Sequence, residues 1–400
     1  MKYDFDKEIE RRGTLSYKWD GIAVEFPENP QALPFWIADM EFACPEPIVK
    51  AVCERAQHPV YGYSHESDDA RKLTASWLKK RHGWEARPEW VTFCGGVVPG
   101  LIAMMLAVTR PGDRVILQPP VYYPLFEMIR DNGRVIVENP LVYDGEKWVI
   151  NYEELEKLAA DPQTTLMLLC NPHNPVSRAF TVPELERLGE ICFRHNLKIA
   201  SDEIHSDIVY KGCVHTPIAS VNDRLAQITM TSLSPSKTFN VAGLQLAVAV
   251  IPNGDLRKKV ERELAASQYL VSLFGAVGLK AAYQDPECEE YLEQLLDYLW
   301  ENYEFVDGYL KKHTPRITCQ RPEATYLLWL DCRRLYLTDE ELYHFFLSDA
   351  GIATDSGTVF GTGGGGYMRL NMACPRAMLQ KALDQLARAY NQLSIKEEIK

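Results

Sequence analysis

Residues 228–251 read ITMTSLSPSKTFNVAGLQLAVAVI, in which two apolar runs enclose a polar segment that carries Lys237. Similar short β-branched or aliphatic runs alternate with longer mixed stretches from about residue 90 to 255: Trp90-Phe93, Arg114-Leu117, Leu166-Cys170, Lys198-Ser201, Ile228-Thr231 and Leu246-Ile251. Strands that are apolar on both faces and alternate with helices form a mostly parallel sheet covered on both sides. The sequence therefore predicts an α/β fold. Polar residues that directly follow the strands are the first candidates for a site, because ligands in such folds lie at the carboxyl ends of strands.

The helical stretches around and beyond this region also have recognisable signals. Residues 181–195 are amphipathic and open with Thr181 and Glu184, which is a capping-box signature. The chain changes character near residue 285, where we expect a domain boundary. After it the sequence predicts an α+β arrangement made of a long helix at 286–312, a strand at 325–330, a capped helix from Thr338 to about Ala350, a glycine-rich loop at 361–366, a strand at 367–371 and a helix at 376–392.

Composition excludes several classes of protein. The 400 residues carry 55 acidic and 43 basic side chains, a net charge of −12, and such a field repels nucleic-acid phosphates. The N-terminus MKYDFDKEIERRG is charged throughout, and the densest apolar stretch, 241–251, is too short to cross a membrane. Ten cysteines without a CxxC pair and nine histidines without HExxH spacing indicate a reduced compartment and no metal site. We therefore expect a cytoplasmic protein that binds neither nucleic acid nor membrane.

Lys237 is the only charged residue between Arg224 and Asp255. A lysine in so apolar a stretch is a candidate for desolvation, which lowers the pKa of its amine and lets it form a Schiff base with an aldehyde. The ordinary interpretation is a solvated lysine of no special role. The residue pattern around Lys237 favours the functional interpretation only together with other signals.

Three further signals lie where apolar runs end. Asp202 follows the run 198–201, the turn Asn171-Pro-His-Asn174-Pro175 follows 166–170, and Gly95-Gly96-Val97-Val98-Pro99-Gly100 joins the first run to a helix. Backbone N–H groups at a helix start can hold an anion. Each of these segments is equally well explained, taken alone, as an ordinary acidic loop or turn.

The sequence also contains a misleading motif. Gly361, Gly363 and Gly366 satisfy GxGxxG, but they lie near the C-terminus and run into a strand. A dinucleotide-binding fingerprint must instead join a first strand to a helix. We therefore interpret 361–366 as a flexible loop.

The order of these signals along the chain resembles the fold-type I pyridoxal-phosphate (PLP) enzymes, the aspartate-aminotransferase superfamily, over essentially the whole length. The segments that resemble its MalY/PatB branch of cystathionine β-lyases, or C–S lyases, are Ile37-Ala-Asp39-Met40-Glu-Phe42, His58-Pro-Val-Tyr-Gly62-Tyr63-Ser, Asp202-Glu-Ile-His205-Ser-Asp207, Ser236-Lys237-Thr-Phe-Asn240 and Met368-Arg369-Leu-Asn371-Met-Ala-Cys-Pro375. The resemblance implies a large domain with a mostly parallel seven-stranded sheet between helices, plus a smaller α+β domain. It implies that residues 1–48 contribute to the small domain, 49–285 form the large PLP-binding domain and 286–400 complete the small domain.

The resemblance assigns catalytic roles to three residues. Lys237 would hold PLP as a Schiff base and then act as the base at the substrate Cα. Asp202 would pair with the pyridine nitrogen and keep it protonated, which makes the ring an electron sink. Tyr122 would stack on the ring.

The other residues implied by the resemblance surround the cofactor or the substrate. The cofactor set is Val97, Val98, Asn174, His205, Ser234, Ser236 and Tyr63, and the substrate set is Arg369, Asn174, Ala38 and Asp39. The phosphate would lie on the N–H groups of Val97 and Val98, with the two serines adding hydroxyls. Asn174 would bind the phenolic O3′, and Tyr63 would reach the phosphate of the neighbouring subunit. Arg369 would clamp the substrate α-carboxylate.

Three positions depart from the related patterns. His205 and Gln245 stand where aminotransferases of the superfamily usually have tyrosine and arginine, which favours the lyase branch. Ser177 stands where the branch commonly has glycine, so a positive φ there would add strain.

The resemblance thus predicts a homodimeric, PLP-dependent β-lyase with shared active sites. It would cleave L-cysteine S-conjugates such as cystathionine to a thiol, pyruvate and ammonia. An aminotransferase on the same fold is the alternative. A third possibility, from another class, is a regulatory protein that contacts a transcription factor.

Overall fold

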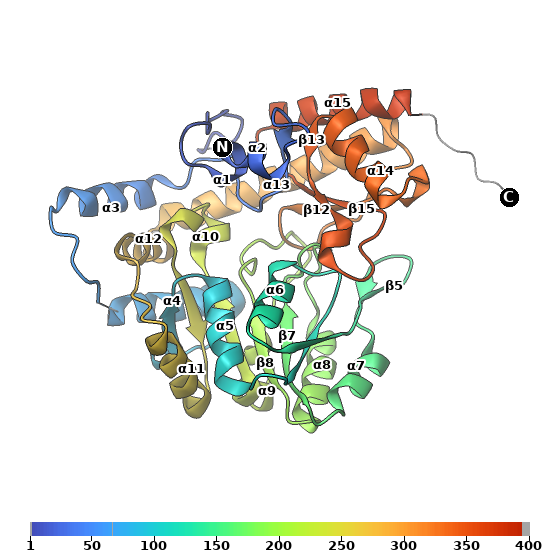
Figure 1. Ribbon diagram of the computed structural model, residues 1–400. Coiled ribbons are helices and arrows are strands. Elements are labelled where there is room, and N and C mark those ends of the chain that lie inside the picture. The colour runs from blue at the N-terminus through green and yellow to red at the C-terminus, as the bar shows by residue number, and fades with distance from the viewer. Residues whose placement is uncertain (1, 66, 394–400) are drawn as a thin grey trace.

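The computed structural model describes residues 2–65 and 67–393, so the ends of the predicted domains at residue 1 and 394–400 lie outside the described residues. Its centre is a seven-stranded sheet in the order β2-β10-β9-β8-β7-β3-β4 (Figure 1). The strands are β2 (Val91–Cys94), β3 (Arg114–Leu117), β4 (Val135–Glu138), β7 (Thr164–Cys170), β8 (Lys198–Asp202), β9 (Thr229–Leu233) and β10 (Ala247–Val250). Only β10 runs antiparallel to its neighbours. The predicted mostly parallel sheet is confirmed.

Both faces of this sheet are buried. In β7, Leu166, Leu168 and Cys170 pack into one apolar cluster, whereas Met167 and Leu169 pack into another. The first cluster includes residues of α5 (Val97–Val108), α6 (Pro124–Asp131) and α11 (Gly254–Ala266), and the second includes residues of α7 (Tyr152–Ala159), α8 (Val182–Arg194) and α9 (Asp223–Ile228). Continuous apolar runs therefore become strands here, because each face meets its own layer of helices.

One strand of the sheet is absent from the six apolar runs of the sequence. It is β4, an edge strand whose four residues are only partly buried or exposed. An edge strand needs fewer apolar side chains, so its signal in the sequence is weaker.

The chain from residue 286 on forms a second, smaller sheet with its own helices, which lies above the large sheet in the view of Figure 1. Its antiparallel sheet has the order β11 (Thr318–Cys319), β12 (Leu327–Asp331), β15 (Tyr367–Asn371) and β14 (Asp355–Ser356). Its helices are α13 (Pro286–His313), α14 (Asp339–His344), which continues as a π-helical turn over Phe345–Asp349, and α15 (Arg376–Gln392). The predicted elements are present. Strand β12 begins two residues later than predicted, because Thr325 has φ +63°, which a strand does not accept.

The N-terminal segment pairs with this second part. Strand β1 (Leu33–Pro34) runs parallel to β13 (Ile352–Ala353), although the two lie more than 300 residues apart in the sequence. The other N-terminal elements are α1 (Tyr17–Asp20), α2 (Ile22–Glu25), α3 (Glu46–Gln57) and α4 (Asp68–His82). The remaining elements are the hairpin of β5 (Val142–Tyr143) and β6 (Trp148–Val149), and the helices α10 (Pro235–Thr238) and α12 (Leu273–Gln284). The domain boundaries at 48 and 285 stay predictions.

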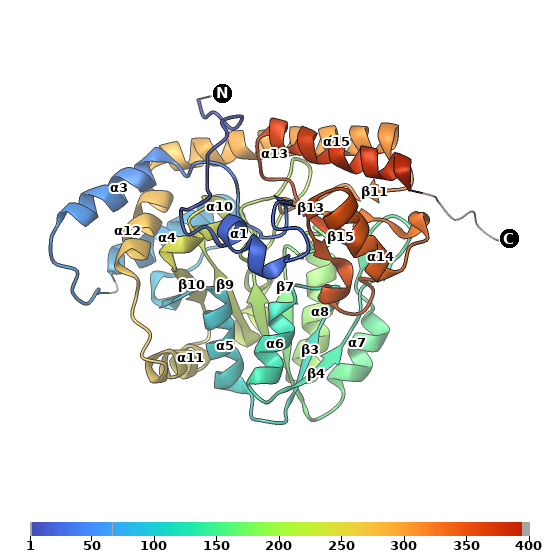
Figure 2. The same ribbon diagram turned by 45° about the horizontal axis from the view of Figure 1, so that its top comes forward.

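The segment that follows α3 lies at the outer edge of the molecule in both views (Figures 1 and 2). Within residues 2–65 and 67–393, no helix is both long enough and apolar enough to cross a membrane.

Candidate active site

A cavity of about 570 Å³ lies at the carboxyl ends of the parallel strands. Its walls come from the segments that follow β2, β3, β7, β8 and β9, together with the N-terminal segment and β15. Ten of the residues predicted for the site line it: Ala38, Val97, Val98, Tyr122, Asn174, Asp202, His205, Ser236, Lys237 and Arg369. Residues from seven separate segments of the chain thus share one cavity.

Lys237 lies in the short helix α10, which begins directly after β9 and Ser234. Its Nζ donates a hydrogen bond of 2.5 Å to the carbonyl oxygen of Ala38, which also accepts one of 2.9 Å from the Tyr326 hydroxyl. Burial lowers the pKa of the Lys237 amine to about 8. About a tenth of this amine is therefore unprotonated at pH 7, far more than for an ordinary lysine, and the unprotonated form is the one that acts as a nucleophile or base.

Asp202 is the last residue of β8 and is buried. Burial raises the pKa of its carboxyl group to about 6, partly offset by a hydrogen bond of 3.1 Å from the Ile204 N–H to Oδ1. A cation or an N–H donor against this carboxylate would bring its pKa down again. The carboxylate is thus suited to a protonated ring nitrogen.

Arg369 is a buried cation on β15. Its guanidinium donates to Asn174 Oδ1 over 3.1 Å, to the carbonyl oxygen of Trp36 over 2.5 Å and to the carboxylate of Asp355. Strand pairing brings Asp355 into place, because Asp355 on β14 stands opposite Arg369 in the register. Its Nε is buried and has no hydrogen-bond partner among the described residues, so one donor is left for a ligand.

Tyr122 and His205 add two neutral rings to the cavity. Burial raises the pKa of the Tyr122 phenol to about 12, and its backbone N–H donates to the Asn174 carbonyl oxygen over 3.0 Å. Burial lowers the pKa of His205 to about 3, so its imidazole is neutral near pH 7. Its Nδ1 is buried and has no hydrogen-bond partner in the part of the chain that the structure describes, which leaves a polar atom available to a ligand.

The opposite end of the cavity offers backbone donors. Helix α5 begins at Val97 after Gly96, and no side chain caps this helix start. The first N–H groups of a helix have no partner within the helix, so they attract an anion. Ser236 lines this cavity, whereas Ser234 does not: its hydroxyl lies 2.6 Å from the Leu246 carbonyl oxygen and 2.5 Å from Ser236 Oγ.

Besides Ser234, two more predicted residues lie outside the cavity. Asp39 forms ion pairs with Arg11 over 2.6 Å and with Lys18 over 3.4 Å, so its carboxylate is already occupied. Tyr63 is 93% exposed in the segment after α3. Among the described residues, neither side chain lines the cavity, although the negative charge of Asp39 raises the pKa of Lys237 against the larger effect of burial.

Two of the three positions that depart from the related patterns shape the backbone around the site. Ser177 has φ +56° and Gln245 has φ +51°, both in the left-handed region, so the positive φ predicted conditionally at 177 is present. Gln245 also lines the cavity.

Sequence reasoning missed Asp355 as a partner of Arg369. It also missed Trp36 and Tyr326, which bind the site through a backbone carbonyl and a hydroxyl. No local signal marks these residues, since their contacts span up to 333 positions of sequence. Only the strand register and the path of the folded chain bring them to the cavity.

Together these groups fit pyridoxal phosphate. The cavity presents an amine for an aldehyde, a buried carboxylate for a ring nitrogen and an uncapped helix start for a phosphate. The unpartnered Nδ1 of His205 and Nε of Arg369 provide further polar contacts. The donors of the residues present thus match the chemistry of this cofactor.

Comparison with known proteins leads to the same family. The family "Aminotransferase class I and II" matches residues 37–386. The chain belongs to this family. The cystathionine beta-lyase PatB of Bacillus subtilis (strain 168) is 40% identical over 387 residues, which cover 96% of this chain and 99% of PatB. The protein MalY of Escherichia coli (strain K12) is 31% identical, covering 97% and 98%.

A solved structure gives the same result in three dimensions. Cystalysin of Treponema denticola, whose crystal structure contains a pyridoxal 5′-phosphate cofactor, has a TM-score of 0.95 and 33% identity, over 98% of this chain and 100% of that chain. The predicted fold-type I architecture and the resemblance to the MalY/PatB branch are confirmed.

Proposed function

We propose that the protein is a PLP-dependent C–S β-lyase. It converts a thioether of L-cysteine, such as L-cystathionine, and water into a thiol, pyruvate and ammonia. The observation that carries this proposal is the half-buried Lys237 amine, which shares one cavity with the buried Asp202 carboxylate and the buried Arg369 guanidinium. The full-length likeness to PatB directs the reaction toward elimination at Cβ.

Bound in this cavity, pyridoxal phosphate supplies an electron sink for the substrate Cα. Lys237 would hold the cofactor covalently through its amine, and the same amine, when free, would take the proton from the substrate Cα. The lowered pKa of its amine supports both roles, because the unprotonated form is accessible. Asp202 holds the proton on the ring nitrogen, which keeps the ring electron-poor.

The remaining residues orient the cofactor. Tyr122 covers the ring, Asn174 binds the phenolic oxygen, and His205 contributes its free Nδ1. The N–H groups of Val97 and Val98 and the Ser236 hydroxyl bind the phosphate. Ser234 supports the phosphate end indirectly, because its hydroxyl lies 2.5 Å from that of Ser236.

Arg369 binds the α-carboxylate of the substrate. Asp355 and the Trp36 carbonyl oxygen hold the guanidinium in place, and Asn174 contacts the guanidinium directly. The N-terminal segment closes this end of the site through the Ala38 carbonyl. The Asp39 carboxylate, which pairs with Arg11 and Lys18, would act here from a distance through its charge, which raises the pKa of Lys237.

An aminotransferase is the alternative, favoured by the family to which the chain belongs. The two reactions differ in one requirement: a transaminase needs a keto acid to complete its cycle. Purified holoenzyme and L-cystathionine without keto acid should release pyruvate, measured with lactate dehydrogenase and NADH. Pyruvate only after a keto acid is added would support the transaminase instead.

We also propose a homodimer in which Tyr63 of the partner subunit completes each phosphate site. The supporting observation is an exposed apolar segment after α3, in which Val60, Tyr61 and Tyr63 are 62%, 59% and 93% exposed. An exposed apolar segment of this kind is typical of an interface.

The ten free cysteines favour the reducing cytoplasm. A regulatory protein contact stays a prediction.

A further inference from the structure

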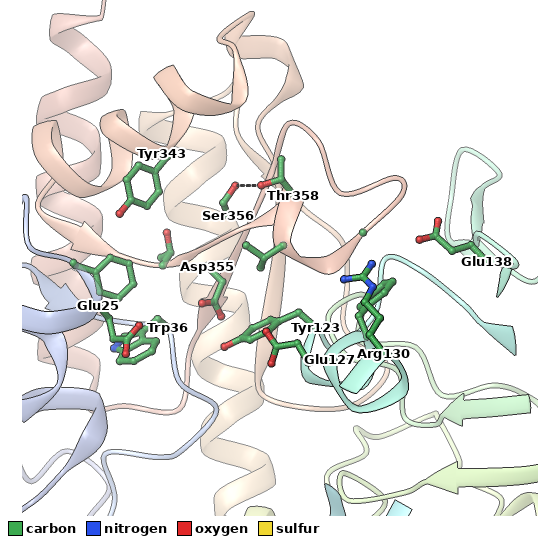
Figure 3. Close-up of a pocket in the computed structure, with 15 residues that line it drawn as sticks. Glu25, Trp36, Tyr123, Glu127, Arg130, Glu138, Tyr343, Asp355, Ser356 and Thr358 are labelled. Carbon is green, nitrogen blue, oxygen red and sulfur yellow. Dashed lines mark hydrogen bonds between the residues drawn. The ribbon is translucent and has the colours of Figure 1, made fainter. Parts of the chain in front are cut away.

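Figure 3 shows the residues that line a second cavity, of about 560 Å³. The two cavities share Glu25, Trp36 and Tyr123 in their walls. The second also includes Asp355, which is bound to Arg369. A substrate whose α-carboxylate lies on Arg369 therefore has this space beside it.

The second cavity has an excess of negative charge. Glu25, Glu127 and Glu138 line it, against the single guanidinium of Arg130, while the charge of Asp355 is balanced by Arg369. Figure 3 draws Glu127 near Tyr123 and Asp355, with Arg130 and Glu138 farther along the cavity. A cleft lined by one sign of charge concentrates ligands of the opposite sign.

The carboxylates differ in how far they are occupied. Glu25 accepts a hydrogen bond of 2.5 Å from the Tyr17 hydroxyl, and Glu138 accepts one from Thr362. Among the described residues, Glu127 has no ion pair or hydrogen bond through its side chain. Arg130 is one helical turn away on α6 and lies over the Phe126 ring at 5.7 Å, rather than on a carboxylate. Glu127 is thus the free anion of this wall.

A second, independent feature indicates a ligand. Thr354 lines the same cavity, is only 2% exposed, and its hydroxyl has no hydrogen-bond partner within residues 2–65 and 67–393. An unpaired buried hydroxyl costs free energy, so such groups are usually satisfied by a bound polar group. Thr354 directly precedes Asp355 in the chain, which brings it to the part of the cavity nearest to Arg369.

We propose that this cavity binds the leaving-group half of the substrate and selects thioethers that carry an ammonium group beyond the sulfur. Glu127, with Glu25 and Glu138, attracts the ammonium, and the Thr354 hydroxyl provides a polar contact along the chain. The inference rests on the proposed lyase function, because the leaving thiol is the part of the substrate that extends past Cβ.

Two substrates of nearly equal shape test the charge preference. S-(2-Aminoethyl)-L-cysteine and S-propyl-L-cysteine differ in an ammonium against a methyl group at the far end. With wild-type holoenzyme, we expect kcat/KM for pyruvate release to favour the aminoethyl compound by about tenfold. Glu127→Gln should reduce this ratio roughly fivefold, the effect of losing about 1 kcal/mol of ion pairing. Arg130→Gln should raise it.

The ratio is measured on one enzyme sample, so partial misfolding of a variant cancels. The matched control is Glu186→Gln on the exposed face of α8, outside both cavities, which should keep the wild-type ratio. Calorimetric titration of Lys237→Ala protein with both compounds gives the same comparison without turnover. A ratio near one, or no response to Glu127→Gln, overturns the inference, and so does a preference for S-(2-carboxyethyl)-L-cysteine.

These experiments distinguish a failure of the ammonium-subsite proposal from a failure of the lyase proposal. If no thioether releases pyruvate, the lyase assignment fails, and the calorimetric ratio still decides the charge preference. Pyruvate release without a charge preference retains the lyase and removes the ammonium subsite.

Discussion

Ser177 provides a quantitative test of how the turn after β7 is held. Its φ of +56° costs a residue with a Cβ about 1 kcal/mol relative to glycine. Its side chain offsets this: Oγ lies 2.8 Å from Thr325 Oγ1 and donates to the Leu327 carbonyl oxygen over 2.5 Å. Two buried hydrogen bonds contribute about 2 kcal/mol together. The serine therefore ties the Asn174 turn to β12, next to the strand of Arg369.

These values predict an order of stability for three residues at position 177. Ser177→Ala keeps the strain and loses both hydrogen bonds, so it should lower the free energy of unfolding by about 2 kcal/mol. Ser177→Gly loses the same bonds but relieves the strain, so its loss should be about 1 kcal/mol. Urea unfolding of the holoenzyme, followed by tryptophan fluorescence, measures both changes.

Gln268 is the matched control, because it has φ +51° and an exposed side chain without a hydrogen bond among the described residues. At this position, Gln268→Gly should raise the free energy of unfolding by about 1 kcal/mol, and Gln268→Ala should leave it unchanged. If Ser177→Ala is as stable as wild type, the hydrogen bonds contribute nothing. If glycine and alanine at 177 are equally stable, the strain argument is wrong.

The remaining predictions concern the proposed catalytic groups. Lys237→Ala should lose turnover but keep the fold and bind PLP noncovalently, and borohydride treatment of wild type followed by peptide mapping should find the reduced adduct on Lys237; an adduct on another lysine contradicts the assignment. Asp202→Asn should lose at least about a hundredfold in kcat, and undiminished turnover would show that the carboxylate is not at the ring nitrogen. Burial raises the Asp202 pKa from 3.8 to about 6, so between these pH values the folded apoprotein binds more protons than the unfolded chain. The Tm of the wild-type apoprotein should therefore fall relative to that of Asp202→Asn as the pH rises from about 4 to 6. Parallel plots of Tm against pH for the two proteins would refute the raised pKa. A further test mixes Lys237→Ala with an inactive variant that carries Tyr63→Phe and a second lesion in residues 58–64. The mixture should regain up to about one quarter of wild-type activity, which is the share expected for shared sites in randomly assorted dimers. Mixed dimers without activity would show that Tyr63 serves its own subunit.

Much of the large sheet was predictable from the sequence, because its strands are buried on both faces and so appear as uninterrupted apolar runs. The same physics identified Lys237, since a lone charge in a long apolar stretch has little water around it. Asp202 and Asn174 followed from their position at strand ends. The edge strand β4 was not among the runs, because a half-exposed strand does not need such a run.

The tertiary structure alone decided which polar groups meet. The β14–β15 register brings Asp355 to Arg369, and the path of the N-terminal segment brings the Ala38 carbonyl to Lys237. The same path gives the Asp39 carboxylate to Arg11 and Lys18 instead of the cavity. The burial of a strand is a property of its own residues and can be recognised locally. The partner of a charged side chain depends on segments hundreds of positions away, so it is decided only when the chain folds.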